Sequence, residues 1–165
     1  YPGWRLSWTL GPKSVIERIS SAGSFLDGGA PHFLQQAALP LVDPEVARAE
    51  AVAIQRHFGR KRATMLERLA QMGIEVPCEP QGAFYCFAGL GGLPESLRDG
   101  MDFFRAALEH RVICVPGEFF DVNPGKRRFG RPSRFRNHVR FSFGPSIDQI
   151  ERGLDGLADM IENYE

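Results

Sequence analysis

Residues 43–73 read DPEVARAEAVAIQRHFGRKRATMLERLAQMG, and this stretch predicts one long helix over residues 44–72. Asp43 is a typical N-cap, Pro44 suits the first helical turn, and Gly73 suits the position just after the last turn. Apolar residues recur between charged ones at helical spacing, as expected for a packed face: Val46, Val52, Ile54, Phe58, Met65, Leu66, Leu69 and Met72. A helix of this length exceeds the usual globular helix, so we expect it to link two packing units.

Residues 1–42 precede this helix and predict a short strand at 4–10, followed by helices at 13–22 and 33–41, the second mostly buried. A lone strand leaves its backbone hydrogen-bonding groups without partners. We therefore expect residues 1–42 to complete a larger domain whose sheet lies upstream of this chain.

Residues 74–165 alternate short strands with helices, which is the pattern of a compact α/β or α+β unit. Strands are expected at 74–78, 83–87, 112–115 and 139–143, and helices at 101–111 and 147–164. This division places one boundary near residue 43, with residues 43–165 able to form a core by themselves.

The charge balance excludes some classes of partner. Twenty basic and twenty acidic residues leave no net charge to attract nucleic acid or an anionic membrane. The loop 126–136 concentrates six basic residues and two phenylalanines, but turn residues at 123–125 and 131–133 favour a surface loop. We expect no nucleic-acid binding; an alternative use of Arg134 or Arg136 is to attract an acidic substrate side chain.

The sequence also bears on location and on metal binding. No stretch reaches the roughly 18 consecutive apolar residues of a membrane span, and no basic-then-apolar leader opens the chain, so we expect a cytoplasmic protein. Cys78, Cys86 and Cys114 lie apart in apolar runs and are expected to be small buried side chains. The histidines lack acidic or cysteine partners at metal spacing, so no metal site is expected.

Two arginines stand on strand-like segments rich in aromatic residues. Arg5 lies in PGWRLSW, residues 2–8, where a guanidinium is costly unless it is paired. Arg140 lies in HVRFSFG, residues 138–144, where alternation puts it on one face of a strand and the apolar residues on the other. A planar guanidinium can donate two parallel hydrogen bonds to a phosphate or a carboxylate. Each arginine is therefore either an anion site or a solvent-exposed side chain.

Five segments, in order along the chain, resemble motifs of the class I/II aminotransferases, which are fold-type I pyridoxal-phosphate enzymes. They are GWRLS at 3–7, QQAA at 35–38, QGAFYCF at 81–87, VPGEFF at 115–120 and RFSF at 140–143. Ser7 departs from the glycine or alanine of the family pattern, a mild change that leaves Arg5 in register. The resemblance spans nearly the whole chain, and its strength lies in the order of the set.

The resemblance implies the C-terminal portion of an aspartate-aminotransferase-like α/β fold. Residues 1–42 would close the large cofactor-binding domain, and residues 43–165 would form the small α+β domain with its linking helix. It also implies that Arg5 binds the phosphate of pyridoxal 5'-phosphate and that Arg140 binds the substrate α-carboxylate.

The family's lysine, which forms the aldimine with the cofactor, lies eight residues before the phosphate-binding arginine, so it is expected upstream of Tyr1 with three residues between them. Lys13, Lys61 and Lys126 do not lie eight residues before Arg5. We interpret them as residues of a first helical turn, a helix surface and a charged loop, respectively. The acid that pairs with the cofactor's ring nitrogen is also expected upstream. We therefore expect no catalytic residue in this chain and expect it to be an incomplete catalyst.

The implied activity is transfer of an amino group between an amino acid and a 2-oxo acid, in a homodimer. Two alternatives stay open, because one scaffold can serve several functions. They are a carbon–sulfur lyase and the effector-sensing domain of a winged-helix transcription regulator. His32 lies in a turn segment that, in the family, often reaches across the dimer interface. It is equally well interpreted as an exposed turn histidine.

Overall fold

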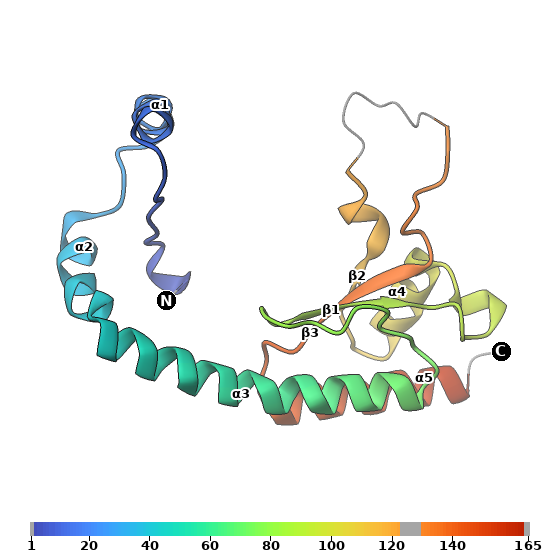
Figure 1. Cartoon of the computed structure of the whole chain (residues 1–165). Helices are drawn as coiled ribbons and strands as arrows, with labels where there is room; N and C mark the ends of the chain where they lie inside the picture. The colour runs from blue at the N-terminus through green and yellow to red at the C-terminus, as the bar shows by residue number, and fades with distance from the viewer. Residues whose placement is uncertain (1, 123–129, 164–165) are drawn as a thin grey trace. The chain divides into compact units, whose positions relative to one another are not determined.

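The computed structural model of this chain describes residues 2–122 and 130–163 (Figure 1). The chain divides into two compact units, Tyr1–Ala53 and Ile54–Glu165, and the boundary falls inside the long helix α3 (Pro44–Gln71). The helix predicted at 44–72 is thus confirmed and runs unbroken past Gly59. Among the described residues, no helix is both long enough and apolar enough to span a membrane.

The first unit consists of short helices joined by turns. It contains the 3-10 turn η1 (Pro2–Trp4), helices α1 (Lys13–Gly23) and α2 (His32–Ala38), the 3-10 turn η2 (Leu39–Val42) and the start of α3. Both predicted helices are confirmed. The expectation that the second is mostly buried is wrong for this chain, because Ala38 is the only buried residue of α2.

The strand predicted at 4–10 is also wrong. Residues 2–4 form η1, Arg5 lies in a turn, and residues 6–12 have no regular secondary structure. A strand needs a neighbouring strand to satisfy its backbone groups, and the described part of this unit offers none. Large apolar side chains such as Trp8, Leu10 and Phe25 are exposed, so the unit builds no core of its own among the described residues.

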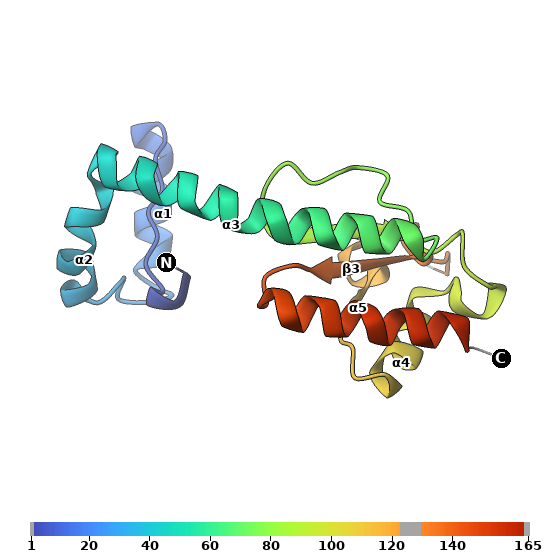
Figure 2. The same cartoon turned by 90° about the horizontal axis from the view of Figure 1, so that it is seen from below.

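The second unit is a small antiparallel sheet covered on one face by helices (Figures 1 and 2). The strands lie in the order β1 (Tyr85–Gly89), β3 (His138–Ser142) and β2 (Val115–Pro116). The helices are the second half of α3, α4 (Gly100–Glu109) and α5 (Ile147–Glu162), with 3-10 turns η3 (Glu95–Leu97) and η4 (Gly117–Phe120). Figure 2 shows α5 beside α3, where Arg68 and Asp155 form an ion pair at 2.7 Å.

The core lies between the helices and one face of the sheet. Alternate strand residues point into it, namely Cys86, Ala88, Val139 and Phe141. They pack with Phe103 of α4 and with the apolar face of α5, which is formed by Ile150, Leu154, Leu157 and Met160. The alternation predicted for residues 139–143 is confirmed, and it leaves Arg140 on the face away from this core.

Two predicted strands are shorter in the structure. Residues 74–78 contribute a single bridge, between Glu75 and Gly89, and residues 112–115 contribute only the start of β2. Proline has no N–H to donate to a strand ladder, so Pro77 and Pro116 limit how far strand pairing extends in the two segments. The other predicted strands and helices of this unit are confirmed with small shifts of their ends; Tyr164, expected to close the last helix, lies outside the described residues.

Two of the three cysteines are buried as predicted. Burial raises the pKa of the Cys86 thiol to about 11 and that of the Cys114 thiol to about 12. Cys78 is exposed, which corrects the expectation for it, because residues 74–78 form no buried strand.

We expect the native protein to expose one reactive thiol per chain, that of Cys78. At pH 8 a pKa raised from 9.0 to about 11 lowers the thiolate fraction of Cys86 about 100-fold, and burial excludes the reagent as well. Titration with Ellman's reagent should show one fast thiol in buffer and three in denaturant. The Cys78→Ser variant should lose the fast phase alone; a fast phase that survives this change would contradict the assignment.

Candidate substrate-binding site

The face of the sheet away from the helices, its open face, carries Arg140, the candidate anion-binding residue on β3. Antiparallel pairing places Arg140 between Phe87 of β1 and Val115 of β2. Tyr85 pairs with Ser142 and therefore lies diagonally next to Arg140 on the same face. This face, away from the helices, is a concentration of aromatic side chains around one half-buried guanidinium.

The Arg140 guanidinium lies close to two aromatic rings. Its Cζ atom is 4.1 Å from the ring centroid of Tyr85 and 4.6 Å from that of Phe120, which belongs to η4. These distances are well within the range for cation–π attraction. No carboxylate or carbonyl oxygen among the described residues accepts a hydrogen bond from this guanidinium. Its N–H groups are therefore oriented but not satisfied by residues in the described part of the chain.

Further aromatic side chains support this arrangement. The ring of Phe87 meets the ring of Phe120 edge-to-face, with centroids 6.1 Å apart, and stacks on the imidazole of His138 at 5.2 Å. Phe135 packs against both Phe87 and His138. The Nδ1 atom of His138 is buried with no hydrogen-bond partner among the described residues. Phe120 thus contacts both Arg140 and, through Phe87, a packed aromatic cluster.

The turn after β2 places Phe120 beside the arginine. Pro116 ends β2 and Gly117 begins η4, which brings the chain around to Phe120. A Cβ atom at Gly117 would lie 2.5 Å from the carbonyl oxygen of Phe135 and 2.8 Å from that of His138. Only glycine allows this approach, so the glycine of the Pro-Gly pair is required by the packing of this turn.

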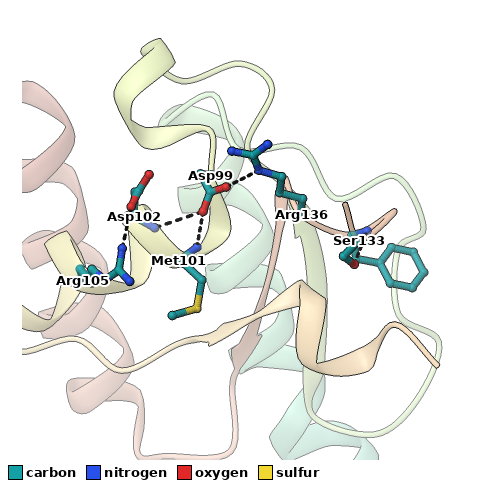
Figure 3. Close-up of polar contacts among 7 residues, drawn as sticks. Asp99, Met101, Asp102, Arg105, Ser133 and Arg136 are labelled. Atoms are coloured by element: carbon teal, nitrogen blue, oxygen red, sulfur yellow. Dashed lines mark hydrogen bonds and ion pairs between the residues drawn. The ribbon is translucent and has the colours of Figure 1, made fainter. Parts of the chain in front are cut away.

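Figure 3 shows how the segment that leads into β3 is anchored. Arg136 Nε donates to Asp99 at 2.6 Å, and Arg134 Nη2 lies 3.4 Å from Asp121, a carboxylate that also accepts from Ser133 Oγ at 2.8 Å. These pairings favour a structural role for both arginines over attraction of an acidic substrate. Residues 123–129, including Lys126 and one flanking turn of the basic loop, lie outside the described residues.

Asp99 is expected to stabilise the protein in a pH-dependent way. Its side chain caps α4 by accepting from the N–H groups of Met101 and Asp102, and the hydrogen bond from Arg136 is the main reason its pKa lies below 3.8. Because the folded pKa is depressed, this contribution is complete above about pH 4 and is lost as pH falls through the folded pKa.

Asp99→Ala should lower the free energy of unfolding at pH 7 by about 1 kcal/mol through loss of the cap. Asp99→Asn keeps a capping oxygen, so it should cost less and should flatten the acid limb of stability against pH. Urea unfolding followed at a series of pH values would check this. An unchanged acid limb in Asp99→Asn would contradict it.

Arg5 belongs to the first unit and occupies an unusual backbone conformation. Its side chain is exposed, and its φ of 56° lies in the left-handed region. Such a conformation costs of order 1 kcal/mol for a residue other than glycine and is often found at ligand-binding turns. Just after it, Leu6, Ser7 and Trp8 line a hollow of about 340 Å³ with residues of α2 and η2, among them Gln35 and Ala38 of the QQAA segment.

The lysines and His32 occupy three different environments. Lys13 is exposed and lies 3.8 Å from Glu17. Lys61, expected on a helix surface, is instead buried: it is 6% exposed, and its Nζ donates to the carbonyl oxygen of Gly144 at 3.1 Å. His32 opens α2, is exposed, and lies within hydrogen-bonding distance of Gln36. No cluster of His, Cys, Asp or Glu suited to a metal ion occurs among the described residues.

Sequence reasoning missed the roles of Tyr85 and Phe120. Both lie inside quoted motif segments, but their convergence on Arg140 depends on strand register and on the η4 turn. Period-two alternation could have placed Tyr85 on the open face of β1. No local signal places Phe120 there.

Comparison with known proteins identifies the family. The chain matches the family described as aminotransferase class I and II over residues 1–157. The chain therefore belongs to the class I and II aminotransferases.

Among its relatives, an aspartate aminotransferase of Streptomyces avermitilis is 33% identical, with 96% of this chain and 37% of that protein covered. An aspartate aminotransferase of Pyrococcus horikoshii is 28% identical, with 93% and 38% covered. This chain thus spans somewhat more than a third of the length of these relatives.

Solved structures show the same relationship in three dimensions. A tetra mutant of Thermus thermophilus aspartate aminotransferase matches with a TM-score of 0.78 at 26% identity, covering 96% of this chain and 39% of that one. An aminotransferase from Mycobacterium tuberculosis matches with a TM-score of 0.76 at 26% identity, covering 99% and 39%. The fold is therefore a portion of the aspartate-aminotransferase fold type I, α/β with a small antiparallel sheet.

Proposed function

We propose that this protein acts as a pyridoxal-phosphate-dependent aminotransferase, and that Arg140 binds the α-carboxylate of the amino acid and of the 2-oxo acid. The observation that carries this proposal is the state of the Arg140 guanidinium. It is half-buried and within cation–π distance of two aromatic rings, yet no acceptor among the described residues meets its N–H groups. A carboxylate supplies two coplanar acceptors, which match one edge of a guanidinium.

Binding at Arg140 would serve the reaction by orientation. Holding the carboxylate in one place fixes the rotation about the bond between the α-carbon and the amino nitrogen, and so fixes the direction of the bond to be broken. Arg140 moves no proton in this scheme, because a guanidinium stays protonated throughout. Pyridoxal phosphate, when bound, supplies the electron sink for chemistry at the α-carbon.

Arg5 is the residue of this chain proposed to hold the cofactor phosphate. Its backbone lies in a left-handed conformation of the kind often found at ligand-binding turns, and a planar guanidinium matches two phosphate oxygens. The domain proposal accompanies this one: residues 1–42 belong to the cofactor-binding domain and residues 43–165 to the small domain. The homodimer implied by the family resemblance and the cytoplasmic location expected from the sequence stay predictions.

The experiment that tests this function uses the protein as its gene encodes it. Arg140→Ala should lower kcat/KM for an amino acid about 100-fold, mainly through KM, because the interaction holds both ground state and transition state. Arg140→Lys should lose less, since a lysine keeps the charge but not the planar pair of donors. The same assays, with the 2-oxo acid product measured, separate transamination from carbon–sulfur elimination.

The amide of the same amino acid provides a control substrate. It lacks the carboxylate charge, so the unchanged protein should use it poorly and Arg140→Ala should discriminate little between the two. Arg105→Ala, at an exposed ion pair on α4, should leave both rates unchanged. If Arg140→Ala keeps the full preference for carboxylate over amide, Arg140 is not the carboxylate site.

A further inference from the structure

We propose that Tyr85 and Phe120 are positioning residues of the carboxylate site, which hold the Arg140 guanidinium by cation–π contact with their rings and so orient its N–H groups toward a ligand. This inference rests on the proposed role of Arg140. It concerns how the arginine achieves that role, and it goes beyond the assignment of the arginine itself.

The two rings reach Arg140 from separate parts of the chain. Tyr85 begins β1, and Phe120 ends η4, while Arg140 lies in the middle of β3. The centroid distances of 4.1 Å and 4.6 Å are shorter than those of the cation–ring contacts made by Lys61 and Arg134, 5.1 Å and 5.9 Å. The guanidinium therefore makes the closest such contacts, and it makes two of them.

The strand register alone does not produce this arrangement. The direct cross-strand neighbour of Arg140 on β1 is Phe87, but the ring of Phe87 packs against those of His138, Phe135 and Phe120. The arginine instead lies over the diagonal neighbour, Tyr85. Because the ring of Phe87 packs edge-to-face against the ring of Phe120, it also helps to hold Phe120 in place.

The two ring contacts have a consequence for binding. An arginine side chain has several rotatable bonds, and fixing them before a ligand arrives removes an entropic penalty from the binding step. A carboxylate that then binds the N–H edge of the guanidinium in the bidentate geometry is held in one orientation.

Phe120→Leu and its neighbour Phe119→Leu form a matched pair of variants. Phe119 lies in the same η4 turn but is 69% exposed and has no ring contact with Arg140. Phe120→Leu is expected to raise KM for the amino acid about 10-fold with kcat little changed, because it loosens a binding group and not a proton-transfer group. Phe119→Leu should leave KM unchanged.

Variants of Tyr85 test the proposal independently of Phe120. They keep it testable even if Phe120→Leu does not fold. Tyr85→Leu should raise KM by a similar factor of about 10, and Tyr85→Phe, which keeps the ring, should recover most of the loss. The Nε–Hε NMR signal of Arg140 should carry the ring-current shift of both rings. Removal of either ring should move it toward its random-coil position.

A double-mutant cycle separates positioning from general structural damage. In an Arg140→Ala background, Phe120→Leu should raise KM no further, since the ring then has no guanidinium to position. If Phe120→Leu raises KM equally in both backgrounds, or if Phe119→Leu matches it, the inference fails while the role of Arg140 stands. If Arg140→Ala itself leaves the carboxylate preference intact, the proposed function fails first.

Discussion

Lys61→Glu is expected to lower the free energy of unfolding of the second unit by about 4 kcal/mol at pH 8. The Lys61 side chain is buried, its Nζ donates to the Gly144 carbonyl oxygen at 3.1 Å, and it lies 5.1 Å from the ring centroid of Phe58. A carboxylate placed there would face a carbonyl oxygen and the negative face of an aromatic ring. Both repel it, and burial removes the water that would otherwise solvate it.

Urea unfolding followed by far-ultraviolet circular dichroism would measure this change. Arg60→Glu is the matched control, because Arg60 is the preceding residue of α3 and is exposed. The same charge reversal there should change stability by less than about 0.5 kcal/mol. Lys61→Met keeps the length and apolar stem without the charge, so it should stay within about 1.5 kcal/mol of the unchanged protein. Equal losses in Lys61→Glu and Arg60→Glu would show that Lys61 is not buried.

Gly117→Ala is expected to destabilise the second unit by about 3 kcal/mol and to weaken substrate binding. The added Cβ would lie 2.5 Å from the Phe135 carbonyl oxygen and 2.9 Å from the Cβ of His138. Neither neighbour is the flexible end of a side chain, so the backbone must shift. That shift would move the segment that enters β3 two residues before Arg140, and it would move the turn that carries Phe120.

Gly153→Ala is the control for Gly117→Ala. Gly153 lies in α5, and a Cβ atom added there meets no heavy atom within 4 Å. Alanine should therefore stabilise the helix by up to about 1 kcal/mol. Thermal unfolding and KM measured on both variants would test the contrast. A Gly117→Ala variant as stable as the unchanged protein would show that residues 117 and 135–138 pack less closely than described.

The helices could be predicted from the sequence more accurately than the strands. A helix is defined by local spacing and local end signals, such as Asp43, Pro44 and Gly73 around α3. A strand is defined by its partner. Residues 4–10 and 74–78 have the composition of strands, yet the first forms none among the described residues and the second contributes one bridge.

Burial of single residues was predicted with mixed success for a related reason. The apolar face of β3 follows from alternation, and Val139 and Phe141 are buried as expected. Lys61 was expected at the surface because lysine usually is, and its burial follows from the approach of Gly144, which lies far along the chain. Cys78 was expected inside because it lies in an apolar run, but it is exposed.

The sequence by itself determined the family, the helical elements, and the choice of Arg5 and Arg140 as candidate anion-binding residues. These conclusions rest on residue order and local spacing, which can be read without any knowledge of packing. The tertiary structure alone decided that Tyr85 and Phe120 contact Arg140, that Arg134 and Arg136 pair with carboxylates, and that Lys61 is buried. Each of these contacts joins residues far apart in the chain, so it depends on strand register and chain reversal, which no local pattern encodes.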